Sequence, residues 1–194
     1  MTPMMQQYLE IKDRYKEYIL MYRIGDFYEM FFDDAKTASS ELDLVLTGKD
    51  CGEAERAPMC GIPYHAVEGY IGRLVGHGYK VAICEQLEDP STAKGLVKRD
   101  VIRMITPGTL IESSLLDEKK NNYICGIYYT ENSVGVAFAD ISTGQISVTA
   151  FFGEERISKL IGEIGVYAPR EVVINVEVSA IDGLERFLRD RLMA

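Results

Sequence analysis

Residues 25–32 read Gly-Asp-Phe-Tyr-Glu-Met-Phe-Phe and set one carboxylate among aromatic and large apolar side chains. In an extended chain alternate side chains share a face, so Phe27 and Glu29 should stand about 7 Å apart on one surface. An aromatic ring can stack on a nucleobase, and a carboxylate beside it can accept a hydrogen bond from a donor on that base. The pair is therefore a candidate base-reading site. The alternative is that Phe27 belongs to the core, where buried aromatic side chains are common.

Cysteine and histidine side chains offer two further kinds of chemistry. Cys60 and His65 form a loose Cys-x4-His spacing with Cys51 upstream, but the short paired spacing of structural zinc sites is missing, and we expect no metal site. His65 has no nearby Ser or Cys arranged as a nucleophile, so a structural hydrogen bond is favoured over a catalytic base. The four cysteines contain no Cys-x-x-Cys pair, which is typical of reduced thiols in a cytosolic chain.

The charge distribution argues for and against a nucleic-acid partner. Residues 94–103 carry four cations in ten residues, a pattern suited to phosphates. The whole chain nevertheless has a formal net charge of −9. Residues 1–118 hold 13 basic and 20 acidic side chains, a balance of −7, and the remainder is −2. That balance counts against simple electrostatic capture of DNA by a basic surface.

The first part of the chain alternates helix and strand patterns. Thr2 and Pro3 predict a helix start, with the helix ending near Tyr15, and Asp33 or Asp34 is expected to cap a second helix. The remaining large side chains of the opening run should pack beneath the pair as a rigid base: Tyr28, Met30, Phe31 and Phe32. Further predicted elements are strands at 18–24, 44–47, 79–86 and up to 106, a polar loop at 48–57, an extended path at 58–65 and a helix at 66–77.

The second part of the chain has a different pattern. Three strands at 123–129, 134–141 and 145–152 are joined by short hairpin connections, and a helix at 154–165, a strand at 171–176 and a helix at 180–193 follow. This order predicts the front part of a ribonuclease H-like sheet, which normally continues with more elements. We therefore predict an α/β (α+β) chain with a mixed-sheet domain at 1–115, a linker at 116–121 and an incomplete ribonuclease H-like domain at 122–194.

The sequence also bears on location. No window approaches the roughly 18 apolar residues of a membrane span, and the first residues lack the basic-then-apolar order of a signal peptide. We expect a cytoplasmic protein with no membrane partner.

Five segments together resemble the N-terminal part of the MutS family of DNA mismatch recognition proteins. They occur in this order: Thr-Pro-Met-Met-Gln-Gln-Tyr at 2–8, Gly-Asp-Phe-Tyr-Glu at 25–29, Gly-Ile-Pro-Tyr-His-Ala at 61–66, Ala-Ile-Cys-Glu-Gln at 82–86 and Thr-Pro-Gly-Thr at 106–109. A weaker match to the second domain of the family lies at 138–144.

The resemblance implies a function in DNA mismatch repair. Phe27 would stack on a mispaired or unpaired base from the minor groove of a kinked duplex, and Glu29 would accept a hydrogen bond from it. Lys49 and Arg99 would lie near the DNA backbone, and the local charge adds Lys98 and Arg103. The family partners would be mismatched double-stranded DNA, MutL at the connector domain, residues 122–194, and a second copy in a homodimer.

The family also couples recognition to a DNA-dependent ATPase that uses ATP and magnesium. No Gly-x4-Gly-Lys-Ser/Thr motif occurs in these residues, so we expect neither cofactor nor catalytic activity in this chain. Two alternatives stay open. Residues 122–194 could act as a protein-interaction module, or as a ribonuclease H-like nuclease, although Asp140 is the only acid in the three hairpin strands.

Overall fold

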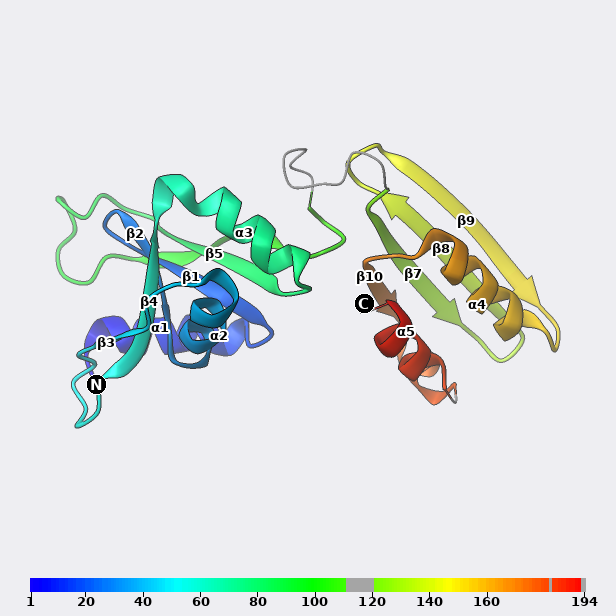
Figure 1. Cartoon of the computed structure of the whole chain (residues 1–194), viewed down its shortest axis with the longest axis horizontal. Coiled ribbons are helices and arrows are strands. Elements are labelled where there is room, and N and C mark those ends of the chain that lie inside the picture. Colours follow the sequence, from blue (N-terminus) through cyan, green and yellow to red (C-terminus); the bar gives the residue numbers. More distant parts are fainter. Residues whose placement is uncertain (111–120, 182, 193–194) are drawn as a thin grey trace. The chain divides into compact units, whose positions relative to one another are not determined.

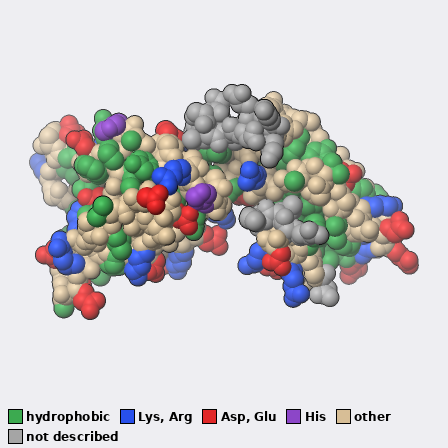
Figure 2. Space-filling view, in the orientation of Figure 1, with side chains coloured by type: hydrophobic (Ala, Val, Ile, Leu, Met, Phe, Trp, Pro, Cys, Tyr) green, Lys and Arg blue, Asp and Glu red, His purple; other side chains and the backbone are tan. Residues whose placement is uncertain are grey.

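The computed structural model describes residues 1–110, 121–181 and 183–192. It divides into two compact units, Met1–Ile105 and Thr106–Ala194, and each is described by itself (Figure 1). Within the predicted linker at 116–121, only Asn121 lies in the described residues. On the face drawn in Figure 2, basic and acidic side chains are interspersed rather than gathered into one basic surface. No helix of the described ranges is long and apolar enough to cross a membrane.

The first unit is built on a six-stranded mixed sheet with the order β3-β4-β2-β1-β5-β6. Strands β1 and β5 are parallel, and every other neighbouring pair is antiparallel. The elements are α1 Pro3–Arg14, β1 Tyr18–Ile24, β2 Phe27–Phe31, α2 Phe32–Leu42, β3 Thr47–Lys49, β4 Ala57–Pro63, a 3-10 turn Tyr64–Ala66, α3 Val67–Gly76, β5 Lys80–Gln86 and β6 Arg99–Ile105.

Helix α1 begins as predicted. The Thr2 hydroxyl accepts a hydrogen bond from the Met5 amide at 3.4 Å, and Pro3 occupies the first turn, where its missing N–H costs nothing. The helix covers one face of the sheet through a buried cluster that includes Met5, Tyr8, Leu20, Tyr22, Phe31, Ala82 and Cys84. The end of β2 is thereby packed against α1.

Helix α2 does not begin as predicted. The helix starts at Phe32, and Phe31 at the cap position makes no side-chain cap bond. Phe32 has φ +55°, so an aromatic residue in the left-handed region makes the sharp passage from β2 into α2. Asp34 is turned inward, where it accepts from the Leu20 amide at 3.0 Å and from Lys12 Nζ at 2.9 Å. A tertiary interaction has replaced the expected cap.

The strand expected at 44–47 is also misplaced. Asp43 ends α2 in the left-handed conformation, and both Val45 and Leu46 are exposed. The strand runs instead over Thr47–Lys49, because its hydrogen bonds are made to β4, with Thr47 opposite Met59. Pairing with a neighbour has overridden the local apolar pattern.

The second unit contains a four-stranded sheet with the order β10-β7-β8-β9. Strands β7, β8 and β9 form the predicted antiparallel meander, and β10 is parallel to β7. The closing helix begins later than predicted, after a 3-10 helix. The elements are β7 Tyr123–Tyr129, β8 Ser133–Asp140, β9 Gln145–Phe152, α4 Arg156–Tyr167, β10 Glu171–Ile174, the 3-10 helix Val176–Ala180 and α5 Leu184–Leu192.

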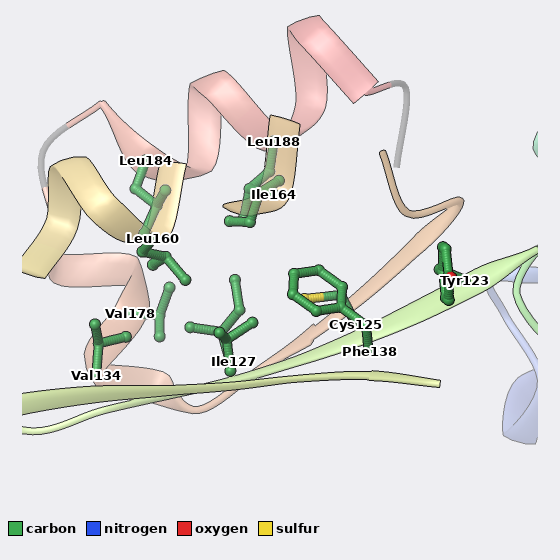
Figure 3. Packing of buried hydrophobic residues seen from close by; sticks show 11 residues of the cluster. Tyr123, Cys125, Ile127, Val134, Phe138, Leu160, Ile164, Val178, Leu184 and Leu188 are labelled. Atoms are coloured by element: carbon green, nitrogen blue, oxygen red, sulfur yellow. The ribbon is translucent and has the colours of Figure 1, made fainter. Parts of the chain in front are cut away.

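Helices α4 and α5 cover the same face of this sheet (Figure 3). The Phe138 ring stacks on Tyr167 with centroids 4.0 Å apart. The cluster drawn in Figure 3 includes Tyr123, Cys125, Ile127, Val134, Phe138, Leu160, Ile164, Val178, Leu184 and Leu188. Both units have mixed sheets with packed helices, which confirms the predicted α/β class.

Candidate nucleic-acid interface

The turn between β1 and β2 is held in place from two sides. Gly25 has φ +56°, a conformation that glycine adopts at no steric cost. Arg23 Nε donates to the Gly25 carbonyl at 2.5 Å, and the Tyr64 amide donates to the Asp26 carbonyl at 2.9 Å. Directly after this fixed turn, Phe27 opens β2 with 47% of its surface exposed. The interpretation of Phe27 as a core residue is therefore wrong.

Phe27 and Glu29 lie on one face of β2, as predicted. They pair in register with Pro63 and Gly61 of β4. A Cβ atom built on Gly61 would lie 3.6 Å from Glu29 Cγ and 3.8 Å from Phe27 Cδ1. The ring and the carboxylate therefore flank a strand position that carries no side chain.

The opposite face of β2 supplies the rigid support. Tyr28 and Met30 are buried on that face. Phe31 is buried on the same face as Phe27 and Glu29, where it packs against α1, and Phe32 in α2 is half-buried. All four side chains are packed, as predicted. The Tyr28 hydroxyl donates to the Glu85 carboxylate, and burial together with this hydrogen bond raises the pKa of Tyr28 to about 12.

Arg23 completes this support. Its guanidinium is 3.4 Å from Glu85 and lies 3.9 Å from the centre of the Tyr64 ring. One arginine therefore joins β1, β5 and the end of β4 behind the exposed pair.

Glu29 is paired with a lysine from the edge strand. Lys49 Nζ lies 2.5 Å from Glu29 Oε2, and the two side chains are 27% and 15% exposed. The ammonium also lies 5.7 Å from the centre of the Phe31 ring. The other carboxylate oxygen, Oε1, has no hydrogen-bond partner among the described residues.

The remaining predicted cations come from β6 and the residue before it, and β6 is three strands away from β2 in the sheet order. Lys98 is exposed; its amide donates to Glu88 and its carbonyl accepts from the Leu87 amide. Arg99 is built into the unit: it donates to the Arg23 carbonyl and to Gln7, and its guanidinium lies 5.0 Å from the Tyr22 ring centre. Arg103 pairs with Glu68 at 3.0 Å. The structure thus brings Phe27, Glu29 and Lys49 together. The Arg99 guanidinium reaches β1, beside Tyr22, whereas the backbones of Lys98 and Arg103 belong to the β6 side of the sheet.

Sequence reasoning missed two residues of this site. The sequence shows Gly61 only as part of a matching segment. Its role comes from its position opposite Glu29, and that position can be known only once the pairing of β2 with β4 is known. Arg23 was visible as the one cation in an otherwise apolar strand. Such a residue calls for an acidic or aromatic partner, and the structure provides both in Glu85 and Tyr64.

The other candidate groups have local structural partners. The thiols of Cys51 and Cys60 donate to the carbonyls of Glu55 and Ala35. Within the described residues no group of three or more His, Cys, Asp or Glu side chains is arranged to hold a metal ion.

Asp140 ends β8 and accepts hydrogen bonds from Ser142, Thr143 and Asn122. Burial acts to raise its pKa, but these hydrogen bonds outweigh it and hold the pKa below its usual value. The carboxylate thus organises the turn between β8 and β9, which is a structural role.

The chain is of a two-unit α/β class: a mixed-sheet unit with an exposed aromatic ring beside a carboxylate, followed by a second mixed-sheet unit. Comparison with protein families gives that class a name. Residues 2–114 match the MutS domain I model, and residues 122–192 match the MutS domain II model. The chain belongs to the MutS family.

Curated relatives agree along the whole chain. The DNA mismatch repair protein MutS of Acetivibrio thermocellus is 55% identical over 191 residues, which is 98% of this chain and 22% of the relative. The protein of the same name from Clostridium botulinum strain 657 is 58% identical over 190 residues, 96% of this chain and 20% of the relative. The MutS protein of Lachnoclostridium phytofermentans is 59% identical over 177 residues, which is 91% of this chain and 19% of the relative. The chain thus spans about a fifth of the length of these relatives.

Contacts and family matches divide the chain at different residues. The domain I match extends to residue 114, whereas the first compact unit ends at Ile105. Residues after Ile105 bond within the second unit: Thr106 Oγ1 and the Gly108 amide donate to Glu171 at 2.5 and 3.1 Å. The predicted boundary after residue 115 stays a prediction.

Proposed function

We propose that this chain reads mismatched double-stranded DNA, with Phe27 stacking on a mispaired or unpaired base and Glu29 accepting a hydrogen bond from it. The observation that carries the proposal is the half-exposed Phe27 ring beside the Glu29 carboxylate on a strand whose other face is buried. An exposed ring on a rigid support can insert between DNA bases without first breaking packing contacts in the protein core.

The selectivity of such a reader would come from the deformability of the DNA. A mispaired step is poorly stacked, so separating its bases and kinking the duplex costs less there than in paired DNA. Glu29 would add a second source of selectivity against fully paired DNA. Where the base offers no hydrogen-bond donor, the carboxylate is left unpaired beside the DNA backbone, and this makes binding of that duplex less favourable. One pair of side chains could in this way serve many different mismatches.

We propose Lys49, Lys98, Arg99 and Arg103 as residues near the DNA backbone. The exposure of Lys98 supports a direct phosphate contact, whereas the internal partners of Arg99 favour a role in holding the segment before β6. Most phosphate contacts would then be made by other parts of a full-length protein. We propose that those parts also supply the ATP and magnesium site and the homodimer contact. The cytoplasmic location stays a prediction.

The test replaces the ring. In a full-length relative whose matching segment is exchanged for this chain, Phe27→Ala should lower the preference for mismatched over matched duplex by about tenfold or more, since stacking on one base contributes about 1–3 kcal/mol. ATP hydrolysis without DNA should be retained. Phe152→Ala, which removes a ring that is 70% exposed on β9, is the control for the loss of an exposed phenylalanine. A retained preference in Phe27→Ala would remove the central claim.

A second function, contact with MutL, is favoured by the outer face of the second sheet. Strand β9 exposes Ile146, Val148 and Phe152 by 70%, 75% and 70%. Apolar side chains gathered on one sheet face indicate a protein partner. Val148→Lys should weaken binding of the chain to MutL, whereas Ile102→Lys, an exposed apolar position of the first unit, should not. Unchanged binding of Val148→Lys would show that MutL does not contact this face.

A further inference from the structure

The ion pair between Lys49 and Glu29 joins two strands that are not neighbours. The sheet order places β4 between β3 and β2, so Lys49 reaches across a whole strand to meet the carboxylate. Both side chains lie on the face of β4 that carries Ala57, Met59 and Gly61, with Lys49 opposite Ala57 and Glu29 opposite Gly61.

We propose that Lys49 is a positioning residue for Glu29, holding one carboxylate oxygen so that the other is presented beside Phe27, and that mismatch preference depends on this hold. The inference rests on the function proposed above. It assigns Lys49 a role that is complete before any DNA is bound, in contrast to a cation that only meets phosphate.

The two oxygens of the carboxylate divide the work. Oε2 is bound by the Lys49 ammonium, and Oε1 has no hydrogen-bond partner among the described residues. An ionised carboxylate can accept at both oxygens, so the second one stays available to a donor on a base. Without the lysine, Glu29 would sample several rotamers, and ordering it on binding would cost affinity.

Lys49 itself is held in an inward direction. Its backbone pairs with Ala57 in β4, its stem is mostly covered, and its ammonium lies near the Phe31 ring as well as Glu29. A second consequence is electrostatic. The ammonium compensates the negative charge of Glu29, which would otherwise repel the phosphates of an approaching duplex.

The experiment is a double-mutant cycle in the exchanged full-length protein described above. Affinity for a duplex with one G·T mismatch and for the same duplex fully paired is measured in four forms: parent, Lys49→Met, Glu29→Ala and the double variant. We expect Lys49→Met to lower the mismatch preference by about threefold or more when Glu29 is present. In the Glu29→Ala background it should change the preference by less than about twofold.

Two variants complete the set. Lys49→Arg keeps the charge and should retain most of the preference. Lys80→Met removes a lysine from another ion pair of the same unit, the one with Glu17, and should leave the preference unchanged. Melting temperatures of all forms establish that each is folded.

A role limited to phosphate contact would give a different pattern. Lys49→Met would then weaken both duplexes equally, in either background, and would reduce the slope of log affinity against log salt by about 0.9. Either that result or additive effects in the cycle would overturn the inference. The proposed function fails separately, through a retained preference in Phe27→Ala. Loss of preference in Phe27→Ala with additive effects at Lys49 and Glu29 would therefore reject the positioning role alone.

Discussion

Gly61 is the residue on which the spacing of the candidate site depends. It lies opposite Glu29 in β4, and a Cβ there would be in ordinary van der Waals contact with both the Phe27 ring and the Glu29 stem. Its φ is not in the left-handed region, so the backbone itself tolerates a side chain. The size of a substituent at this position should therefore decide how far the ring and the carboxylate stand apart.

We predict that Gly61→Ala leaves the mismatch preference within about twofold, whereas Gly61→Val lowers it by about tenfold, because its γ-methyl groups enter the space between the ring and the carboxylate. Competition binding in the exchanged full-length protein measures both. Gly126→Val, a strand glycine of the second unit with open space around it, is the control for adding the same side chain to a sheet. Equal effects of Ala and Val would contradict this spacing role.

At the scale of elements, the first unit is tied together by a partly buried ion pair. Lys12 Nζ from α1 lies 2.9 Å from Asp34 of α2, and it also donates to the Tyr18 carbonyl of β1 at 2.5 Å. Burial raises the pKa of Asp34 above its ordinary value, although hydrogen bonds from Leu20 and Lys12 act to lower it. The ion pair therefore joins α1, β1 and α2.

We predict that Lys12→Met lowers the free energy of unfolding by about 2 kcal/mol near neutral pH, between the cost of an exposed pair and that of a fully buried one. Without Lys12 the pKa of Asp34 rises further. A carboxyl whose pKa is higher in the folded than in the unfolded state gains stability on protonation, so the loss should shrink as pH falls toward about 4.

Urea unfolding of the chain at about pH 7 and about pH 4.5 checks this dependence. The control is Lys36→Met, which removes an ion pair with Asp33 whose side chains are 58% and 94% exposed, and which should cost less than about 0.5 kcal/mol at either pH. A loss in Lys12→Met that is the same at both pH values would rule out Asp34 as the titrating group.

The elements that could be predicted from the sequence are those whose local pattern and tertiary role agree. Helix α1 has its Thr2 cap and Pro3 start, and β1 is an apolar run between turn signals. The start of α2 could not be predicted, because Asp34 bonds to β1 and Phe32 takes a conformation that aromatic residues rarely adopt. The course of β3 was hidden for the same reason: its Thr-Gly-Lys sequence has little strand preference without β4 beside it.

The candidate site divides in the same way. That Phe27 and Glu29 share a face follows from the period of a strand, and the structure confirms it. That Lys49 meets Glu29 depends on the strand order β3-β4-β2, which no local pattern in the sequence contains. Spacing along one strand can thus be read from sequence, whereas contacts across a sheet cannot.

For the whole molecule, the charge balance constrains how this chain can meet DNA. The formal net charge is −9, and the cations near the candidate site are engaged: Lys49 with Glu29, and Arg23 with Glu85. Phosphate binding by counterion release needs several cations that are free to approach the backbone. Under the proposed function, the chain would therefore supply a side chain that enters the base stack and little of the affinity for the duplex.

We predict that the chain by itself binds both mismatched and matched duplexes more weakly than about 1 µM at physiological salt. The affinity should also depend only shallowly on salt, because each phosphate contact contributes about 0.9 to the slope of log affinity against log salt and few contacts are made. Fluorescence anisotropy with labelled duplexes measures both quantities, and the exchanged full-length protein serves as the positive control. Submicromolar binding by the chain alone would mean that this acidic unit carries a phosphate-binding surface of its own, since the stacking of one ring contributes at most about 3 kcal/mol.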